Sequence, residues 1–355
     1  MAVFAGPATM ETLHGDQINA TFVIQVNAVC QQGSMVVMKL AAPDAGRRRA
    51  LLRRCTAIAC GLALAGCGGA AAKPARALRG YSWLEPMLSV SSARLTGKVD
   101  SNGAPLPGGS ETFVPFMFPV AVVTSMGALF IADAGHGRLF RYQHAGGLMA
   151  IVPGVRINAT TRLRAGPGGI VYVLDGTQGV IQRYSMMGQS LSPLQARYPA
   201  SHYLDFDVDQ SSGRVFAVDS LTRLLDQIEP LGRLAIAHLE LNAAGPVALD
   251  GAKLLVADAQ CQCVNEWRDR RLVRKLAFGQ IRLPKALAAD EGEVYVLDGF
   301  DRSISRVFEG GLESMLPGEL GLISPEQISV FAGMMHVADG SGRSVSVFRI
   351  RRRQH

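Results

Sequence analysis

Short apolar stretches that end at an aspartate recur along this chain with a nearly constant spacing. Each stretch combines residues such as Val, Leu, Phe and Tyr, ends in Ala-Asp, Leu-Asp or Val-Asp, and is followed by turn-forming residues. The aspartates are Asp133, Asp175, Asp219, Asp258, Asp298 and Asp339, at intervals of 42, 44, 39, 40 and 41 residues. A period near this length is typical of a repeat architecture in which every repeat is one supersecondary unit.

The pattern inside each repeat predicts β-strands. In residues 119–142, two apolar runs flank Gly127, and a third follows the turn after Asp133. Runs rich in Val, Ile, Tyr and Phe, bounded by Gly, Asp and Ser, indicate strands and hairpins. A fourth strand is expected in the next stretch, for example at 272–278. Four antiparallel strands in about 40 residues form one blade of a β-propeller, so we expect an all-β, six-bladed propeller over residues 85–355.

The last repeat ends before its fourth strand. Its third strand is expected at 344–350, close to the C-terminus, whereas residues 85–95 precede the first repeat and have strand character. We predict that this N-terminal strand completes the last blade and closes the ring, because closure removes exposed strand edges that promote aggregation.

The repeat resembles the NHL repeat over residues 113–353. A proline leads into the first strand at Pro119, Pro246, Pro284 and Pro325, the six aspartates end the second strand, and an arginine follows at Arg138, Arg223, Arg302 and Arg343. The Asn of that family is mostly absent, and the second and fourth repeats lack the arginine. We interpret each aspartate as structural, accepting backbone N–H groups of the following turn and pairing with the arginine, because six equivalent copies are not expected of an active site.

The chain upstream of the repeats has the features of an export signal. Residues 47–54 are rich in arginine, and the apolar stretch 55–65 is too short to span a bilayer. The following Leu-Ala-Gly-Cys67 resembles a bacterial lipobox, which implies that Cys67 is acylated after cleavage and anchors the protein in the membrane. Gly68 implies, by the same resemblance, an outer-membrane lipoprotein facing the periplasm. A soluble export signal is the alternative, and both the Sec and the twin-arginine export routes remain open.

These signals divide the chain into four parts. We expect a mis-called upstream extension at 1–37, a signal peptide at 38–66, a tether at 67–84 and the propeller at 85–355. The formal charge of +7 includes six basic and three acidic residues before residue 67, so the remainder carries +4. This mild excess gives no reason to expect nucleic-acid binding, which requires a clustered basic stripe.

Few residues suggest chemistry, and no nucleophile, P-loop or dinucleotide motif is present. Asp205, Asp207 and Asp209 alternate along a predicted strand and would share one face, where they could bind a divalent cation or simply face solvent. Cys261 and Cys263 form a free pair, a labile disulfide or a turn. His336 is expected to be a buried structural histidine.

Two functions remain open. In the first, the propeller is a binding or scaffolding module for an envelope protein or glycan, with no cofactor, and uses the loop face that carries His136, Gln178, Thr222, Gln262 and Phe300. In the second, it is a metal-dependent enzyme, as the resemblance to propeller lactonases and amidating lyases implies. The sequence lacks a convergent set of Glu, Asn and His at the inner strand ends, so the binding module is the preferred hypothesis.

Overall fold

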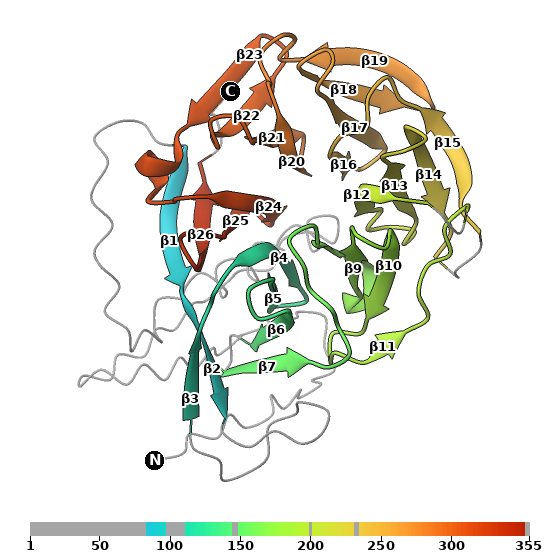
Figure 1. Cartoon of the computed structure of the whole chain (residues 1–355). Helices are drawn as coiled ribbons and strands as arrows, with labels where there is room; N and C mark the ends of the chain where they lie inside the picture. The colour runs from blue at the N-terminus through green and yellow to red at the C-terminus, as the bar shows by residue number, and fades with distance from the viewer. Residues whose placement is uncertain (1–82, 97–110, 144–147, 199–200, 231–233, 352–355) are drawn as a thin grey trace, which may run out of the picture. The chain divides into compact units, whose positions relative to one another are not determined.

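A computed structural model describes residues 83–96, 111–143, 148–198, 201–230 and 234–351 (Figure 1). The chain divides into two compact units, Met1–Leu62 and Ala63–His355, and all described residues belong to the second. The expected upstream extension, the signal peptide and Cys67 lie outside the described residues.

The described residues form a six-bladed β-propeller, as the repeats predict. Six four-stranded antiparallel sheets stand in a ring (Figure 1). From the inner strand outward, blades one to three contain β4 (Pro119–Ser125), β5 (Ala128–Asp133), β6 (Arg138–Gln143) and β7 (Leu148–Val152); β8 (Arg162–Ala165), β9 (Val171–Asp175), β10 (Val180–Tyr184) and β11 (Ser190–Leu191); and β12 (Tyr203–Val208), β13 (Val215–Asp219), β14 (Leu224–Ile228) and β15 (Ile236–Glu240).

Blades four to six follow the same order. They contain β16 (Val247–Asp250), β17 (Lys253–Asp258), β18 (Cys263–Arg268) and β19 (Arg271–Leu276); β20 (Pro284–Asp290), β21 (Glu293–Asp298), β22 (Ile304–Phe308) and β23 (Gly311–Met315); and β24 (Pro325–Phe331), β25 (Met334–Asp339), β26 (Ser344–Ile350) and β1 (Leu84–Val90). Two short 3-10 turns, η2 (Pro167–Gly169) and η3 (Pro317–Leu320), lie between strands.

The hydrophobic core lies between the blades. Six apolar clusters each join two successive blades, for example Val122 and Ile131 of blade one with Ala338 and Val345 of blade six. Each inner strand contacts the inner strands of both neighbouring blades, which closes the ring; we call the region around its axis, between the inner strands, the channel. Because a blade is covered on both faces, its strands have continuous apolar runs, as the fully buried β5 shows.

The N-terminal strand closes the ring as predicted. β1 pairs antiparallel with β26, from Leu84↔Ile350 to Val90↔Val345, and so completes blade six. The second half of the predicted strand 85–95 does not follow this pairing. It forms β2 (Ser92–Thr96), which pairs with β3 (Glu111–Pro115) and, in parallel, with β7 of blade one. The chain therefore holds the first and last blades together with two successive strands.

The expected boundary between tether and propeller requires a small correction. Trp83 and Leu84 were assigned to the tether, but both are buried in the cluster between blades five and six. The Trp83 ring stacks on Tyr295 of blade five, with the ring centroids 5.5 Å apart. Both residues fill part of this cluster, so they belong to the propeller and not to the tether.

The repeated aspartates lie at one side of the ring. The register pairs the beginning of an inner strand with the aspartate that ends the next strand, as in Pro119↔Asp133, Pro284↔Asp298 and Pro325↔Asp339. The loops that enter the inner strands and the turns after the six aspartates therefore share one face. We call this side of the propeller the turn face.

Candidate functional site

The repeated aspartates organise the turn face. Asp133 is 0% exposed; its Oδ1 accepts hydrogen bonds from the N–H groups of Phe118 and Gly135, at 2.9 and 3.0 Å, and its Oδ2 accepts one from Met117 at 2.9 Å. Burial raises the pKa of this carboxyl, but hydrogen bonds from His136, Met117 and Phe118 outweigh it and hold the pKa below its ordinary value. The aspartate thus fastens the incoming loop to the following turn.

Two other aspartates repeat this arrangement. Asp298 accepts bonds from Arg282, Leu283 and Phe300, and Asp339 from Ile323, Ser324 and Gly342. In the remaining blades the carboxyl mainly holds its own turn, through the N–H groups of Thr177 at Asp175, Leu221 and Thr222 at Asp219, and Gln260 and Cys261 at Asp258. These bonds agree with a structural interpretation of the aspartates.

The expected pairing of these aspartates with arginines is not formed. No ion pair among the described residues joins Arg138, Arg223, Arg302 or Arg343 to a repeat aspartate. Arg223 Nη1 donates instead to the Asn242 carbonyl at 3.3 Å, and Arg302 Nη1 to the Ile323 carbonyl at 3.2 Å. Both carbonyls belong to the loop that leads to the next blade. Arg223, Arg302 and Arg343 have positive φ values of 56°, 63° and 52°, so each occupies a left-handed position in its turn.

The residues of the predicted binding face lie on the turn face, in five different blades. Gln178, Thr222, Gln262 and Phe300 are exposed, Phe300 by 62%. His136 is instead held by Asp133, with 2.9 Å between Nδ1 and Oδ2. None of the five lines the cavity described below, but Gly299, the neighbour of Phe300, does. Cys261 and Cys263, on either side of Gln262, are joined by a disulfide, so they are not a free pair.

A cavity of about 370 Å³ opens at the channel mouth on the turn face. Its lining comes from the beginnings of the inner strands of blades two, three and five, the loop before β16 and the turn after Asp298. The residues that line this mouth cavity are Arg162, Leu204, Asp205, Pro246, Leu283, Pro284, Lys285 and Gly299. Four of the eight are apolar leucines and prolines, and three are charged. This combination of apolar walls and a few polar groups is typical of small-molecule sites.

The charged groups at the mouth differ in their partners. The Lys285 ammonium lies 2.5 Å from Glu326 Oε2 and donates a hydrogen bond to the Pro325 carbonyl at 3.3 Å. The half-buried Arg162 donates a hydrogen bond from Nη1 to the Thr161 carbonyl at 3.2 Å, the one side-chain hydrogen bond that it makes within the described residues. Burial lowers the pKa of Arg162; Asp205 and Glu326 oppose this lowering, and neighbouring Arg164 adds to it.

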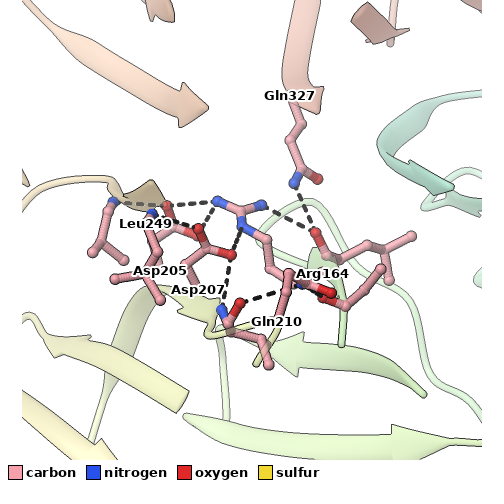
Figure 2. A network of polar contacts seen from close by, with 10 residues as sticks. Arg164, Asp205, Asp207, Gln210, Leu249 and Gln327 are labelled. Carbon is pink, nitrogen blue, oxygen red and sulfur yellow. Dashed lines mark hydrogen bonds and ion pairs between the residues drawn. The ribbon is translucent and has the colours of Figure 1, made fainter. Parts of the chain in front are cut away.

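Beneath the mouth, a polar network occupies the channel (Figure 2). Arg164 Nη2 donates to both Asp205 oxygens at 3.1 Å, and Arg164 Nε lies 3.6 Å from Asp207 Oδ1. Asp205 and Asp207 also accept the N–H groups of Val247, at 3.1 Å, and Leu249, at 2.7 Å. The network therefore joins the inner strands of blades two, three and four.

Two glutamines extend this network. Gln327 of blade six is 0% exposed, and its Nε2 donates to the Leu163 carbonyl of blade two at 3.1 Å (Figure 2). Gln210 Nε2 donates to the Ala165 carbonyl at 2.6 Å. The Gln327 bond bridges two blades that are both neighbours of blade one, so its side chain crosses part of the channel.

The structure does not form the predicted three-carboxylate cation site. Asp205 and Asp207 lie together, but Arg164 and backbone N–H groups occupy their oxygens. Asp209 lies in the turn after β12, where it accepts bonds from Ser211 and Ser212. The described part of the chain contains no group of three or more His, Cys, Asp and Glu residues placed to hold a metal ion. These carboxylates do not fit a resident cation, because the Arg164 guanidinium and backbone N–H groups already occupy their oxygens.

The Asp207 carboxyl is shifted toward its neutral form. Its side chain is 18% exposed, yet protein atoms surround it in the narrow channel. Burial raises its pKa to about 6, against the opposing effect of Arg164 and of the N–H groups of Leu249 and Val208, and Asp205 raises it further.

His336 is buried, as predicted, and its Nε2 lies 3.1 Å from Thr124 Oγ1.

The sequence pattern pointed to the carboxylates Asp205 and Asp207 of this site, but not to the arginines Arg162 and Arg164. Arg162 and Arg164 alternate on β8 as Asp205 and Asp207 alternate on β12, and these two inner strands are neighbours. The paired alternation was a usable signal. Lys285 and Gln327 carried no such signal, because neither belongs to an alternating run of charged residues.

Comparison with known proteins supports the fold. No protein-family model matches the chain, and no curated protein matches it by sequence. Among solved structures, a virginiamycin B lyase from Staphylococcus aureus superposes with a TM-score of 0.51 at 11% identity, covering 74% of this chain and 98% of that one. A gluconolactonase from Xanthomonas campestris has a TM-score of 0.52 at 14% identity, with the same coverage. At such identities the likeness shows the propeller fold alone.

A third solved structure, a protein of unknown function from Bacteroides thetaiotaomicron, has a TM-score of 0.52 at 11% identity. The match covers 74% of this chain and 76% of that one.

Within the residues that the structure describes, no helix has the length and apolarity that crossing a bilayer requires.

Proposed function

We propose that this propeller is a binding module that takes its ligand at the channel mouth on the turn face. The observation that carries the proposal is the mouth cavity of about 370 Å³, lined by apolar side chains and by Arg162 and Lys285. Its volume lies in the range of roughly 300–1,000 Å³ that is usual for small-molecule sites. The Arg164 network adjoins the cavity through Asp205, which belongs to both.

The alternative, a metal-dependent enzyme of the lactonase or lyase kind, has less support. The similar solved structures include a lyase and a gluconolactonase, but they share only the fold with this chain. The carboxylates nearest the mouth are engaged by Arg164 and by backbone N–H groups. A cavity with apolar walls and a partly unengaged guanidinium is better suited to holding a ligand.

A screen of small molecules tests the binding site. We would record ligand-detected NMR spectra of the purified protein with neutral, acidic and basic fragments, and repeat them with Leu204→Trp, which fills the mouth cavity. Fragments that bind the wild type are expected to lose binding to this variant. Leu221→Trp is the matched control, because Leu221 is 69% exposed on the turn face and does not line the cavity.

The proposal fails if no fragment binds, or if the fragments bind Leu204→Trp as well as they bind the wild type. Circular dichroism spectra that match across the three proteins establish that the variants are folded. A fragment that Leu221→Trp also loses would bind the turn face outside the cavity and would count against the mouth as the site.

We also propose that Cys67 is lipidated and anchors the propeller in the cell envelope, where an envelope protein or a glycan would be a partner. The support is the lipobox-like Leu-Ala-Gly-Cys67 after an apolar stretch. Metabolic labelling with a palmitate analogue should mark the wild type and Cys60→Ser, and it should fail to mark Cys67→Ser. Labelling of Cys67→Ser at the wild-type level would refute the anchor.

A further inference from the structure

In the part of the chain that the structure describes, Arg162 differs from Arg164 and Lys285 in having no carboxylate within ion-pair distance. Arg164 pairs with Asp205, and Lys285 pairs with Glu326. Among the described residues, no ion pair involves Arg162. Asp205 and Glu326 attract it only from beyond ion-pair distance. The guanidinium carries five N–H donors, and its one hydrogen bond is the one to the Thr161 carbonyl.

Such a guanidinium is costly to keep in a half-buried position. A cation removed from water needs an anion and hydrogen-bond acceptors to offset the loss of hydration. Arginine does not lose its proton in proteins, so it cannot avoid this cost by becoming neutral. A planar guanidinium that lines a cavity suits a carboxylate in particular, because its parallel N–H groups match the two carboxylate oxygens.

The acidic groups near Arg162 do not prevent an anion from entering the mouth cavity. Both oxygens of Asp205 accept bonds from Arg164, and one also accepts the Val247 N–H group. Glu326 is paired with Lys285. Among the described residues around the mouth, Arg162 is therefore a cation with no carboxylate within ion-pair distance, whereas Arg164 and Lys285 each have one.

The rest of the lining defines the other end of the ligand. Leu204 and Leu283 are 39% and 55% exposed, and they line the cavity together with Pro246 and Pro284. Exposed apolar side chains around a cavity gain free energy when a ligand covers them. The ligand that matches both features has a carboxylate at one end and an apolar body at the other.

We infer that the mouth cavity binds a small organic acid whose carboxylate pairs with the Arg162 guanidinium and whose apolar body packs on Leu204 and Leu283. This inference rests on the proposed binding function of the mouth, and it adds the chemical class of the ligand.

Benzoate and benzamide are the probes, because they have nearly the same shape and differ in charge. Saturable binding of benzoate to the purified protein is expected in ligand-detected NMR titrations, with benzamide binding at least about tenfold more weakly, as expected for loss of one charge-assisted hydrogen-bond pair. Arg162→Gln should weaken benzoate by about the same factor and leave benzamide unchanged.

Two further variants separate charge from structure. Arg162→Lys keeps the positive charge and should retain part of the benzoate affinity. Arg343→Gln removes an exposed arginine of the turn face that does not line the cavity, and its benzoate affinity should equal that of the wild type. Thermal unfolding of each variant shows whether it is folded.

Equal binding of benzoate and benzamide would overturn the inference, and so would full benzoate affinity in Arg162→Gln or no benzoate binding at all. If neutral fragments bind the wild type and lose binding to Leu204→Trp while benzoate does not bind, the binding function of the mouth stands and only the ligand class is wrong. If no fragment of any kind depends on the cavity, the proposed function fails with it.

Discussion

Aspartates have different roles in this molecule, and the hydrogen-bond donors around each carboxylate determine its role. Asp133, Asp298 and Asp339 each receive at least three backbone N–H groups and fasten the turn face. Asp205 and Asp207, in the channel, meet a guanidinium instead. Asp209, only two residues further, closes a hairpin turn. The identity of a carboxylate along the chain therefore says little about its role without its neighbours.

Asp207 should make stability depend on pH. Its folded pKa of about 6 lies above the ordinary 3.8, so between these values the native state binds more protons than the unfolded state. Its contribution to the free energy of unfolding is present below about pH 4 and is lost as the pH rises through 6, by up to about 3 kcal/mol. Asp207→Asn should remove this dependence in urea unfolding at pH 4.5 and 7.

Asp209→Asn is the control for that measurement. Burial raises the pKa of Asp209, but hydrogen bonds from Ser211 and Ser212 hold it below its ordinary value, so its contribution has the opposite sign and is lost as the pH falls. If Asp207→Asn keeps the wild-type pH dependence, Asp207 does not titrate in this range.

Loss of a turn-fastening aspartate should destabilise the propeller strongly. Asp339→Ala leaves the N–H groups of Ile323, Ser324 and Gly342 without their acceptor, and we expect a loss of about 2–4 kcal/mol. The exposed Asp301 accepts one N–H group, from Ser303, so Asp301→Ala should cost less than about 1 kcal/mol. Chemical unfolding of both variants measures the difference, and equal losses would contradict the fastening role.

At the scale of elements, one strand from the N-terminal side completes the last blade and covers the outer edge of β26. β1 supplies the outer strand of blade six, and β2 extends blade one directly afterwards. Leu84 at the beginning of β1 is buried between blades five and six. The closure therefore joins residues more than 250 positions apart in the chain, as the register Leu84↔Ile350 shows.

Removal of this strand should leave the edge of β26 unpaired and the protein prone to aggregation. Deletion of residues 67–96 is expected to give insoluble protein. The milder Leu84→Ala should cost about 2–5 kcal/mol, since it opens a cavity in the core, whereas Ser89→Ala, at an exposed position of the same strand, should change stability little. A deletion variant that stays soluble with an unchanged melting temperature would show that closure by β1 is unnecessary.

At the scale of the whole molecule, polar side chains in the channel connect four of the six blades. Arg164 of blade two holds carboxylates of blade three that in turn accept N–H groups of blade four, and Gln327 brings blade six to the same place (Figure 2). The blades therefore share polar contacts at the axis in addition to the apolar clusters between them.

Arg164→Met should destabilise the assembled ring by about 3–5 kcal/mol, because it leaves Asp205 buried without its counter-ion. The double variant Arg164→Met/Asp205→Asn should recover part of this loss, which a double-mutant cycle measures. Arg162→Met is the matched control on the same strand and should cost little, since Arg162 has no ion pair among the described residues. Additive effects of Arg164→Met and Asp205→Asn would contradict the coupling.

The repeat period, the strand pattern and the terminal strand could be read from the sequence because they depend on neighbours along the chain. Alternation of apolar residues between Gly and Asp is sufficient to predict a hairpin. The missing fourth strand of the last repeat indicated a partner for residues 85–95, although only the first half of this segment pairs there. The structural role of the aspartates was also readable, since an aspartate at a strand end caps the turn that follows it.

Only the tertiary structure decided which charged residues meet. Arg164 and Asp205 are 41 residues apart, and Gln327 and Leu163 are 164 residues apart. The sequence alone left open whether Asp205, Asp207 and Asp209 bind a cation or face solvent, because it could not show that Arg164 of the neighbouring blade contacts the first two. Closing the ring brings the six inner strands to one axis, and this geometry, which no local pattern encodes, creates both the Arg164 network and the mouth cavity beside Arg162.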